Sequence, residues 1–72
     1  MESIEKMIER WFKYHPPKGD QVERYGRIRA AAKEFAEVIN ENGFENGDSW
    51  EALQRLRVVV MIANASIACG EA

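Results

Sequence analysis

The chain has 72 residues and a single cysteine, so the sequence predicts one domain, residues 1–72, without an internal disulfide. Its formal net charge of −2 argues against a general DNA-binding protein. One histidine and one cysteine do not make a zinc site, and we expect neither a metal nor a cofactor.

The N-terminus has no apolar segment of the kind that signal peptides carry, and the longest apolar run, residues 58–63, is too short to span a bilayer. We therefore expect no membrane partner, and the single cysteine fits a reducing compartment, the cytoplasm. A core of this size is marginal by itself, and oligomerisation is a usual way to stabilise it.

Residues 3–14 are predicted to form a short amphipathic helix, because Ile4, Ile8 and Trp11 recur at helical spacing. Pro16 and Pro17 end it, since proline lacks a backbone donor and pushes the preceding residue out of the helical region.

Residues 11–18 combine three aromatic rings, the only histidine, both prolines and two lysines. A stiff corner with ring faces and positive charge suits a flat, anionic ligand such as a nucleotide, and its candidate binding residues are Tyr14, His15 and Pro16. The same residues also make an ordinary helix stop with a hydrophobic plug. The residues of the corner alone leave both interpretations open.

The second helix is predicted over residues 20–42. Asp20 followed by Glu23 resembles a capping box, and Gly43 is a typical residue for a helix end. Arg29 lies within the apolar face and Lys33 at its edge. A buried cation needs a partner, which is either a carboxylate of another helix or a bound phosphate.

A third helix is predicted over residues 49–69, beginning at Asp48 or Ser49 after a polar loop. Apolar residues recur along it at spacings of three and four, which forms a narrow seam for a partner helix. The β-branched run at residues 58–60 would also allow a strand, but the seam continues past both ends of this run and therefore favours a helix. The other apolar residues make the helix apolar nearly all round, which fits the core of an oligomer. Asn64 amid apolar neighbours either fixes the packing register or contacts a ligand. The seam consists of Leu53, Leu56, Val60, Ala63 and Ile67.

The sequence thus predicts an all-α fold in which a short N-terminal helix precedes an antiparallel two-helix hairpin. Its charges are segregated: residues 10–33 hold seven cations and two anions, whereas residues 34–51 hold six anions and no cation. A local basic field attracts small anions, but the same segregation serves head-to-tail contacts between subunits or a solvated face. No catalytic constellation is visible, so we expect a protein that is not an enzyme.

Several motifs resemble those of a family of small phage proteins, the second described type of anti-CBASS cyclic-oligonucleotide sponge. The corner Tyr14-His15-Pro16-Pro17 and the run Ala-Asn-Ala-Ser-Ile-Ala at residues 63–68 carry most of the resemblance. Tyr25, Arg29 and Lys33 fall at matching positions between them, and the similarity extends over residues 12–68.

This resemblance implies a compact homo-oligomer, a hexamer in the family, that acts in the cytoplasm of the host bacterium. It implies that the protein sequesters cyclic dinucleotides and cyclic trinucleotides of antiviral defence without cleaving them. In a dinucleotide site between protomers, Tyr14 would stack on a base, and Arg29, with Lys33 nearby, would meet a phosphate. Trinucleotides would occupy separate pockets near the threefold axes.

The chain departs from the family in the loop at residues 42–48 and in the tail Cys69-Gly70-Glu71-Ala72. Some relatives have a basic residue in this tail, and its absence bears more on the dinucleotide site than on the trinucleotide site. The alternative function is a structural or adaptor oligomer without a ligand. A phosphodiesterase is the least supported class, because the sequence shows no metal or acid–base cluster.

Overall fold

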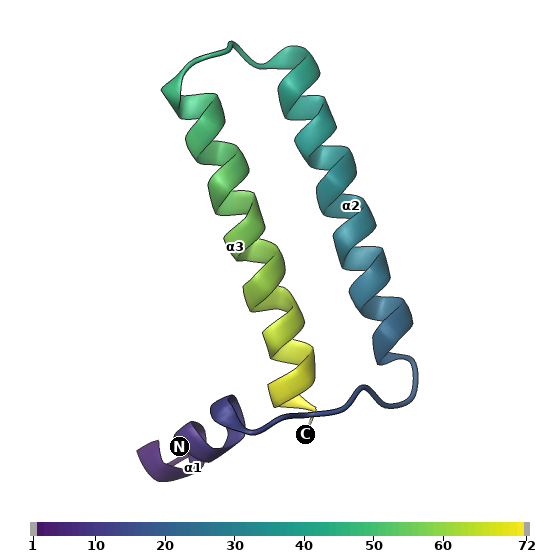
Figure 1. The fold of residues 1–72 in the computed structure, drawn as a ribbon, viewed down its shortest axis with the longest axis vertical. Coiled ribbons are helices and arrows are strands. Elements are labelled where there is room, and N and C mark those ends of the chain that lie inside the picture. Colours follow the sequence, from purple (N-terminus) through teal and green to yellow (C-terminus); the bar gives the residue numbers. More distant parts are fainter. Residues whose placement is uncertain (1, 72) are drawn as a thin grey trace.

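The structure, a computed structural model, describes residues 2–71 and consists of three helices over that range (Figure 1). They are α1 (Ile4–Phe12), α2 (Gln21–Asn42) and α3 (Gly47–Gly70). Helices α2 and α3 form an antiparallel hairpin, and α1 lies at its open end, next to the C-terminal end of α3 (Figure 1). No strand occurs in residues 2–71, which confirms the predicted all-α fold. Ala72 of the predicted tail lies outside the described residues.

Helix α1 is shorter than predicted, because the chain becomes extended at Lys13, with φ −95° and ψ 140°. The Arg10 carbonyl, which would accept from Tyr14 N–H in a longer helix, instead accepts from His15 Nε2 at 2.6 Å. His15 precedes Pro16, which disfavours a helical conformation at that position. The histidine ring therefore takes over one of the hydrogen bonds that the end of α1 leaves open.

The predicted capping box at Asp20 is wrong. Asp20 makes no side-chain cap hydrogen bond, and its carboxylate instead lies 3.5 Å from Arg24 Nη1. The first turn of α2 is entered through Gly19, whose φ of +57° favours glycine. The side-chain carbonyl of Gln21 accepts from Lys18 N–H at 3.1 Å, so an amide one residue later stabilises the turn.

Helix α3 starts two residues earlier than predicted, because Asn46 is its N-cap and accepts from the N–H groups of Asp48 and Ser49, each at 3.1 Å. At the end of α2, the Gly43 N–H donates to the Ile39 carbonyl at 2.7 Å. A Cβ at Gly43 would lie 2.6 Å from that oxygen, so this close approach requires glycine although φ is negative.

The single chain leaves most of its apolar surface uncovered. Ile67 is the only buried apolar residue in the described range, and on α3 the residues Val58, Val59, Met61 and Ile62 are 50–67% exposed. The chain exposes 6112 Å², whereas a compact monomer of this mass exposes about 4,600 Å². By length and composition, α3 is also the one helix in residues 2–71 that could cross a membrane.

Candidate functional site

A pocket of about 390 Å³ lies where the loop after α1 meets the open end of the hairpin. We call it the corner pocket. It brings together four of the residues predicted from the sequence, although they come from three separate segments of the chain. Its lining consists of Tyr14, His15, Pro17, Tyr25, Arg29, Asn64, Ala65 and Ala68.

The loop presents Tyr14 with its side chain open to solvent: the residue is 79% exposed. The next residue, His15, is partly buried and fixed by its hydrogen bond to the Arg10 carbonyl. Because a carbonyl only accepts, His15 Nε2 carries the proton in this contact. The ring of Tyr14 is therefore free to stack, while its neighbour ties the loop to α1.

Helix α2 contributes Tyr25 and Arg29, which share a face because they are four residues apart. Arg29 is exposed, and in residues 2–71 its guanidinium makes no hydrogen bond or ion pair with a carboxylate. Of the two partners predicted for this cation, the carboxylate is thus not supplied from within the described chain.

Helix α3 contributes Asn64, whose Oδ1 atom is buried and has no hydrogen-bond partner among residues 2–71. An unsatisfied buried acceptor costs free energy, and native proteins seldom keep one without a reason. The neighbouring Ala65 and Ala68 have small side chains, so the backbone of α3 is accessible beside the amide. Among residues 2–71, the corner pocket is thus lined by a cation without a carboxylate partner and by Asn64, whose buried Oδ1 has no hydrogen-bond partner.

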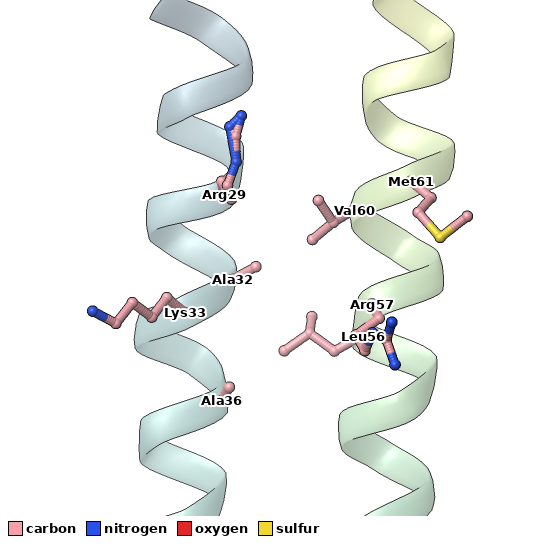
Figure 2. Close-up of a pocket in the computed structure, with 8 residues that line it drawn as sticks. All are labelled: Arg29, Ala32, Lys33, Ala36, Leu56, Arg57, Val60 and Met61. Atoms are coloured by element: carbon pink, nitrogen blue, oxygen red, sulfur yellow. The ribbon is translucent and has the colours of Figure 1, made fainter.

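A second hollow of about 400 Å³ continues along the same side of the hairpin toward its tip, and we call it the hairpin groove (Figure 2). Arg29 lines both hollows, so they adjoin at this residue. The groove has an apolar floor with cations at its margins and no carboxylate in its lining. Its residues are Arg29, Ala32, Lys33, Ala36, Leu56, Arg57, Val60 and Met61.

Lys33 lines the groove and not the corner pocket. Figure 2 shows its side chain pointing away from α3, and its Nζ lies 4.0 Å from a carboxylate oxygen of Glu37. Pro16 does not line the corner pocket either, whereas Pro17 does. The stiff corner thus turns its second proline, rather than its first, toward the pocket.

The structure adds residues that the sequence did not single out for the site. Tyr25 had a detectable signal, since it lies one helical turn before Arg29. The sequence signal for Arg57 was weaker, because an arginine one helical turn before Met61 does not differ from an ordinary solvent-exposed cation. Its guanidinium lies 3.3 Å from Gln54 Oε1 and has no carboxylate partner in the described range.

These side chains supply ring faces, guanidinium groups and an amide, which together bind bases by stacking and phosphates by charge. In the described range, no hydrogen bond joins a tyrosine hydroxyl of the corner pocket to His15, the residue there that could act as its base. Within residues 2–71 there is also no group of three histidine, cysteine, aspartate or glutamate side chains that could hold a metal ion.

A model of the family described as "Acb2/Tad1, hairpin domain" matches residues 5–68. The chain belongs to the Acb2/Tad1 family. This is the anti-CBASS sponge family, so the resemblance inferred from the Tyr-His-Pro-Pro corner and the Ala-Asn-Ala-Ser-Ile-Ala run is confirmed. No curated protein and no solved structure matches the chain.

The Acb2/Tad1 match extends through the loop after α1, all of α2 and most of α3. It therefore includes every residue of the corner pocket and of the hairpin groove. The tail from Cys69 onward lies beyond the matched residues, as does the carboxylate of Glu71, which contacts Arg24.

Proposed function

We propose that this protein is a phage anti-defence sponge, which sequesters cyclic dinucleotides and cyclic trinucleotides without cleaving them and so keeps CBASS effectors inactive. One observation carries the proposal: the corner pocket sets the open Tyr14 ring, the unpaired Arg29 guanidinium and the unsatisfied Asn64 amide around one hollow. Membership of the Acb2/Tad1 family supports it.

The proposed binding mode follows from the chemistry of the three groups. A base stacks on the face of Tyr14, and the adjoining phosphate meets Arg29, whose fork suits a phosphate better than a lysine would. The Asn64 amide can form hydrogen bonds with a base edge, either as it stands or with its oxygen and nitrogen exchanged.

The size of the pocket supports a site completed by a second copy of the chain. A volume of about 390 Å³ is near the lower end of the range of ligand pockets, which runs from about 300 to 1,000 Å³. A cyclic dinucleotide carries two bases and two phosphates, and this pocket offers one exposed ring and one guanidinium. We propose that the second base and phosphate meet a neighbouring protomer.

The exposed face of α3 supports the assembly that such a site needs. The chain exposes about 1,500 Å² more than a compact monomer of its mass, whereas a stable interface removes about 800 Å² per partner. We propose a homo-oligomer, a hexamer by family resemblance, in the cytoplasm of the host bacterium.

The alternative is a structural or adaptor oligomer without a ligand, and the same exposed face of α3 is the observation that favours it. One experiment separates these functions and also tests for an enzyme. The protein is incubated with cyclic dinucleotides or trinucleotides, separated from free ligand, heated to release what it holds, and the released material is identified by mass. Intact ligand supports a sponge, altered ligand an enzyme, and no uptake a scaffold.

A further inference from the structure

Gln21, at the start of α2, is the one buried polar residue in the described range, with 4% of its surface exposed. Both ends of its amide have a partner. The carbonyl oxygen accepts from Lys18 N–H at 3.1 Å, and the Nε2 group donates to Glu71 Oε1 at 3.1 Å. These partners also fix the orientation of the amide, because a backbone N–H requires an acceptor and a carboxylate requires a donor.

Glu71 is held in turn by Arg24. The guanidinium donates from Nη2 to Oε2 at 2.6 Å and from Nη1 to Oε1 at 2.9 Å, which is the two-point geometry of a strong arginine–carboxylate pair. The carboxylate thus accepts three hydrogen bonds from the first turn of α2. We call Lys18 N–H, Gln21, Glu71 and Arg24 the clasp.

The loop between α1 and α2 carries Tyr14 and has two attachments through side chains, besides the backbone hydrogen bond from Gln21 N–H to the Lys18 carbonyl at 3.1 Å. His15 Nε2 binds the Arg10 carbonyl at the α1 end, and Lys18 N–H binds Gln21 at the α2 end. Between them the residues have no helical hydrogen bonds, and beyond them Gly19 reverses the chain at φ +57°. Without the clasp, the α2 end of the loop would keep only the backbone hydrogen bond between Gln21 N–H and the Lys18 carbonyl.

We infer that Gln21, held in place by Glu71, is a positioning residue that fixes the Tyr14–His15 loop in its ligand-competent place over the corner pocket. This inference rests on the proposed function, since competence refers to binding a cyclic dinucleotide there. Gln21 touches no ligand itself and acts through the backbone of the loop. It lies outside the lining of the corner pocket.

We expect the clasp variants to lose affinity, because a smaller fraction of the molecules would have the loop in its ligand-competent place. Apparent affinity falls in proportion to the fraction of molecules whose loop is in place. If loss of one attachment leaves between about a third and a tenth of the loops in place, affinity falls about three- to tenfold.

The test uses calorimetric titration of the full chain with cyclic di-AMP and cyclic di-GMP. Glu71→Ala is the first variant, because Glu71 is at the surface and its loss leaves no cavity. Gln21→Ala is the second. Glu51→Ala is the matched control, since it breaks another glutamate–arginine pair, with Arg55 at 2.8 Å, near the opposite end of the hairpin.

Both clasp variants should bind three- to tenfold more weakly, and Glu51→Ala should bind like the parent protein. Glu71→Gln keeps an acceptor oxygen for Gln21 and should retain most of the affinity. In a Tyr14→Ala background, Glu71→Ala should cause no further loss of affinity, because the ring that the loop positions is already absent. Equal losses with and without Tyr14 would show a general effect on folding and overturn the inference.

Amide hydrogen exchange without ligand supplies a second readout. In Glu71→Ala and Gln21→Ala, the amide of Lys18, which donates to Gln21 Oε1, should exchange faster, while the amides in the middle of α2 keep their protection. Unchanged exchange in the loop would overturn the inference whatever the ligand does. If the parent protein takes up no cyclic dinucleotide, the proposed function fails, and the exchange data alone judge whether the clasp orders the loop.

Discussion

His15 Nε2 lies 2.6 Å from the backbone carbonyl oxygen of Arg10, so the ring of a loop residue closes the last turn of α1. The contact sets where the loop leaves the helix, and Tyr14 is the residue immediately before it. His15→Ala should free this carbonyl and loosen the loop, and we expect cyclic dinucleotide affinity to fall about threefold or more. Calorimetric titration measures this.

His15→Gln is the informative companion variant, because its side-chain N–H is able to donate to the same carbonyl. It should recover part of the affinity that His15→Ala loses. Equal affinity in the parent protein and His15→Ala would show that the hydrogen bond has no part in presenting Tyr14.

Removal of the Tyr14 ring should weaken cyclic dinucleotide binding about ten- to a hundredfold, since stacking of a base on an aromatic side chain contributes about 1–3 kcal/mol. Tyr14→Phe keeps the ring face and should retain most of the affinity, whereas Tyr14→Ala should not. Calorimetry with dinucleotides and trinucleotides compares the variants, and trinucleotide uptake should survive if its pocket is separate.

Phe44→Ala is the control for the loss of an exposed aromatic ring. Phe44 is 81% exposed and lies near the tip of the hairpin, far along the chain from the corner pocket. Its loss should leave the affinity unchanged. Unaltered dinucleotide binding in Tyr14→Ala would mean that the corner is only a helix stop.

Arg29→Ala should weaken dinucleotide uptake and leave assembly intact, because the guanidinium is exposed and no carboxylate of residues 2–71 pairs with it. A hydrogen bond to a charged group contributes about 1.5–3 kcal/mol, so we expect a loss of about ten- to a hundredfold. Titration gives the affinity, and light scattering gives the assembled mass.

Arg27→Ala is the matched control, since Arg27 lines a different hollow, with Arg24, Ile28 and Ala31. It should keep the affinity that Arg29→Ala loses. If Arg29 instead pairs with a carboxylate of a neighbouring copy, Arg29→Ala will lose assembly or stability without ligand present, and the phosphate assignment falls.

The exposed face of α3 should be covered by other copies of the chain. Light scattering at micromolar protein should return a multiple of the 8.3 kDa chain mass. Val59→Glu, which puts a charge on this face, should lower that mass, whereas Val22→Glu near the start of α2 tests for a nonspecific effect of charge. Both parent side chains are more than half exposed in the single chain. A stable monomer, or a protein that is recovered only with membranes, would contradict the assembly.

The clasp should make stability depend on acid pH. Hydrogen bonds from Arg24 and then Gln21, with the positive charges of Arg24 and Lys18 nearby, lower the pKa of Glu71 below its ordinary value. The hydrogen bond to Glu71, with the negative charges of Glu71 and Asp20 nearby, raises the pKa of Arg24. The pKa of Glu71 is lower in the folded chain than in the unfolded chain. Its contribution to the free energy of unfolding is therefore complete above the ordinary glutamate pKa of about 4.3.

This contribution is then lost as the pH falls through the lowered pKa of the folded protein. Thermal unfolding of the parent protein and Glu71→Gln, followed from pH 7 to pH 3, should differ at the upper end and converge at the lower end. High salt should shrink the difference, since the pair is partly exposed. A difference that stays constant with pH would mean that the Glu71 charge contributes nothing.

The sequence by itself determined the three helices, the corner at the prolines and membership of the family. These depend on neighbouring residues: apolar spacing builds the helices, Pro16 and Pro17 stop one, and Gly19 turns the chain. The predictions from the sequence were wrong at helix ends, because capping depends on a single side chain. Asn46, rather than Asp48, caps α3, and Gln21, rather than Asp20, stabilises the entry to α2.

Only the tertiary structure decided which side chains meet. The tertiary structure brings Asn64 and Tyr14 into the lining of one pocket, although 50 residues separate them, and the hairpin brings Glu71 against Gln21 and Arg24. The relative position of two helices depends on how their faces pack, and no single segment contains that information. Arg29 shows the consequence: its place on an apolar face predicted a buried cation, but the wide, shallow hairpin of one chain leaves it exposed between two hollows.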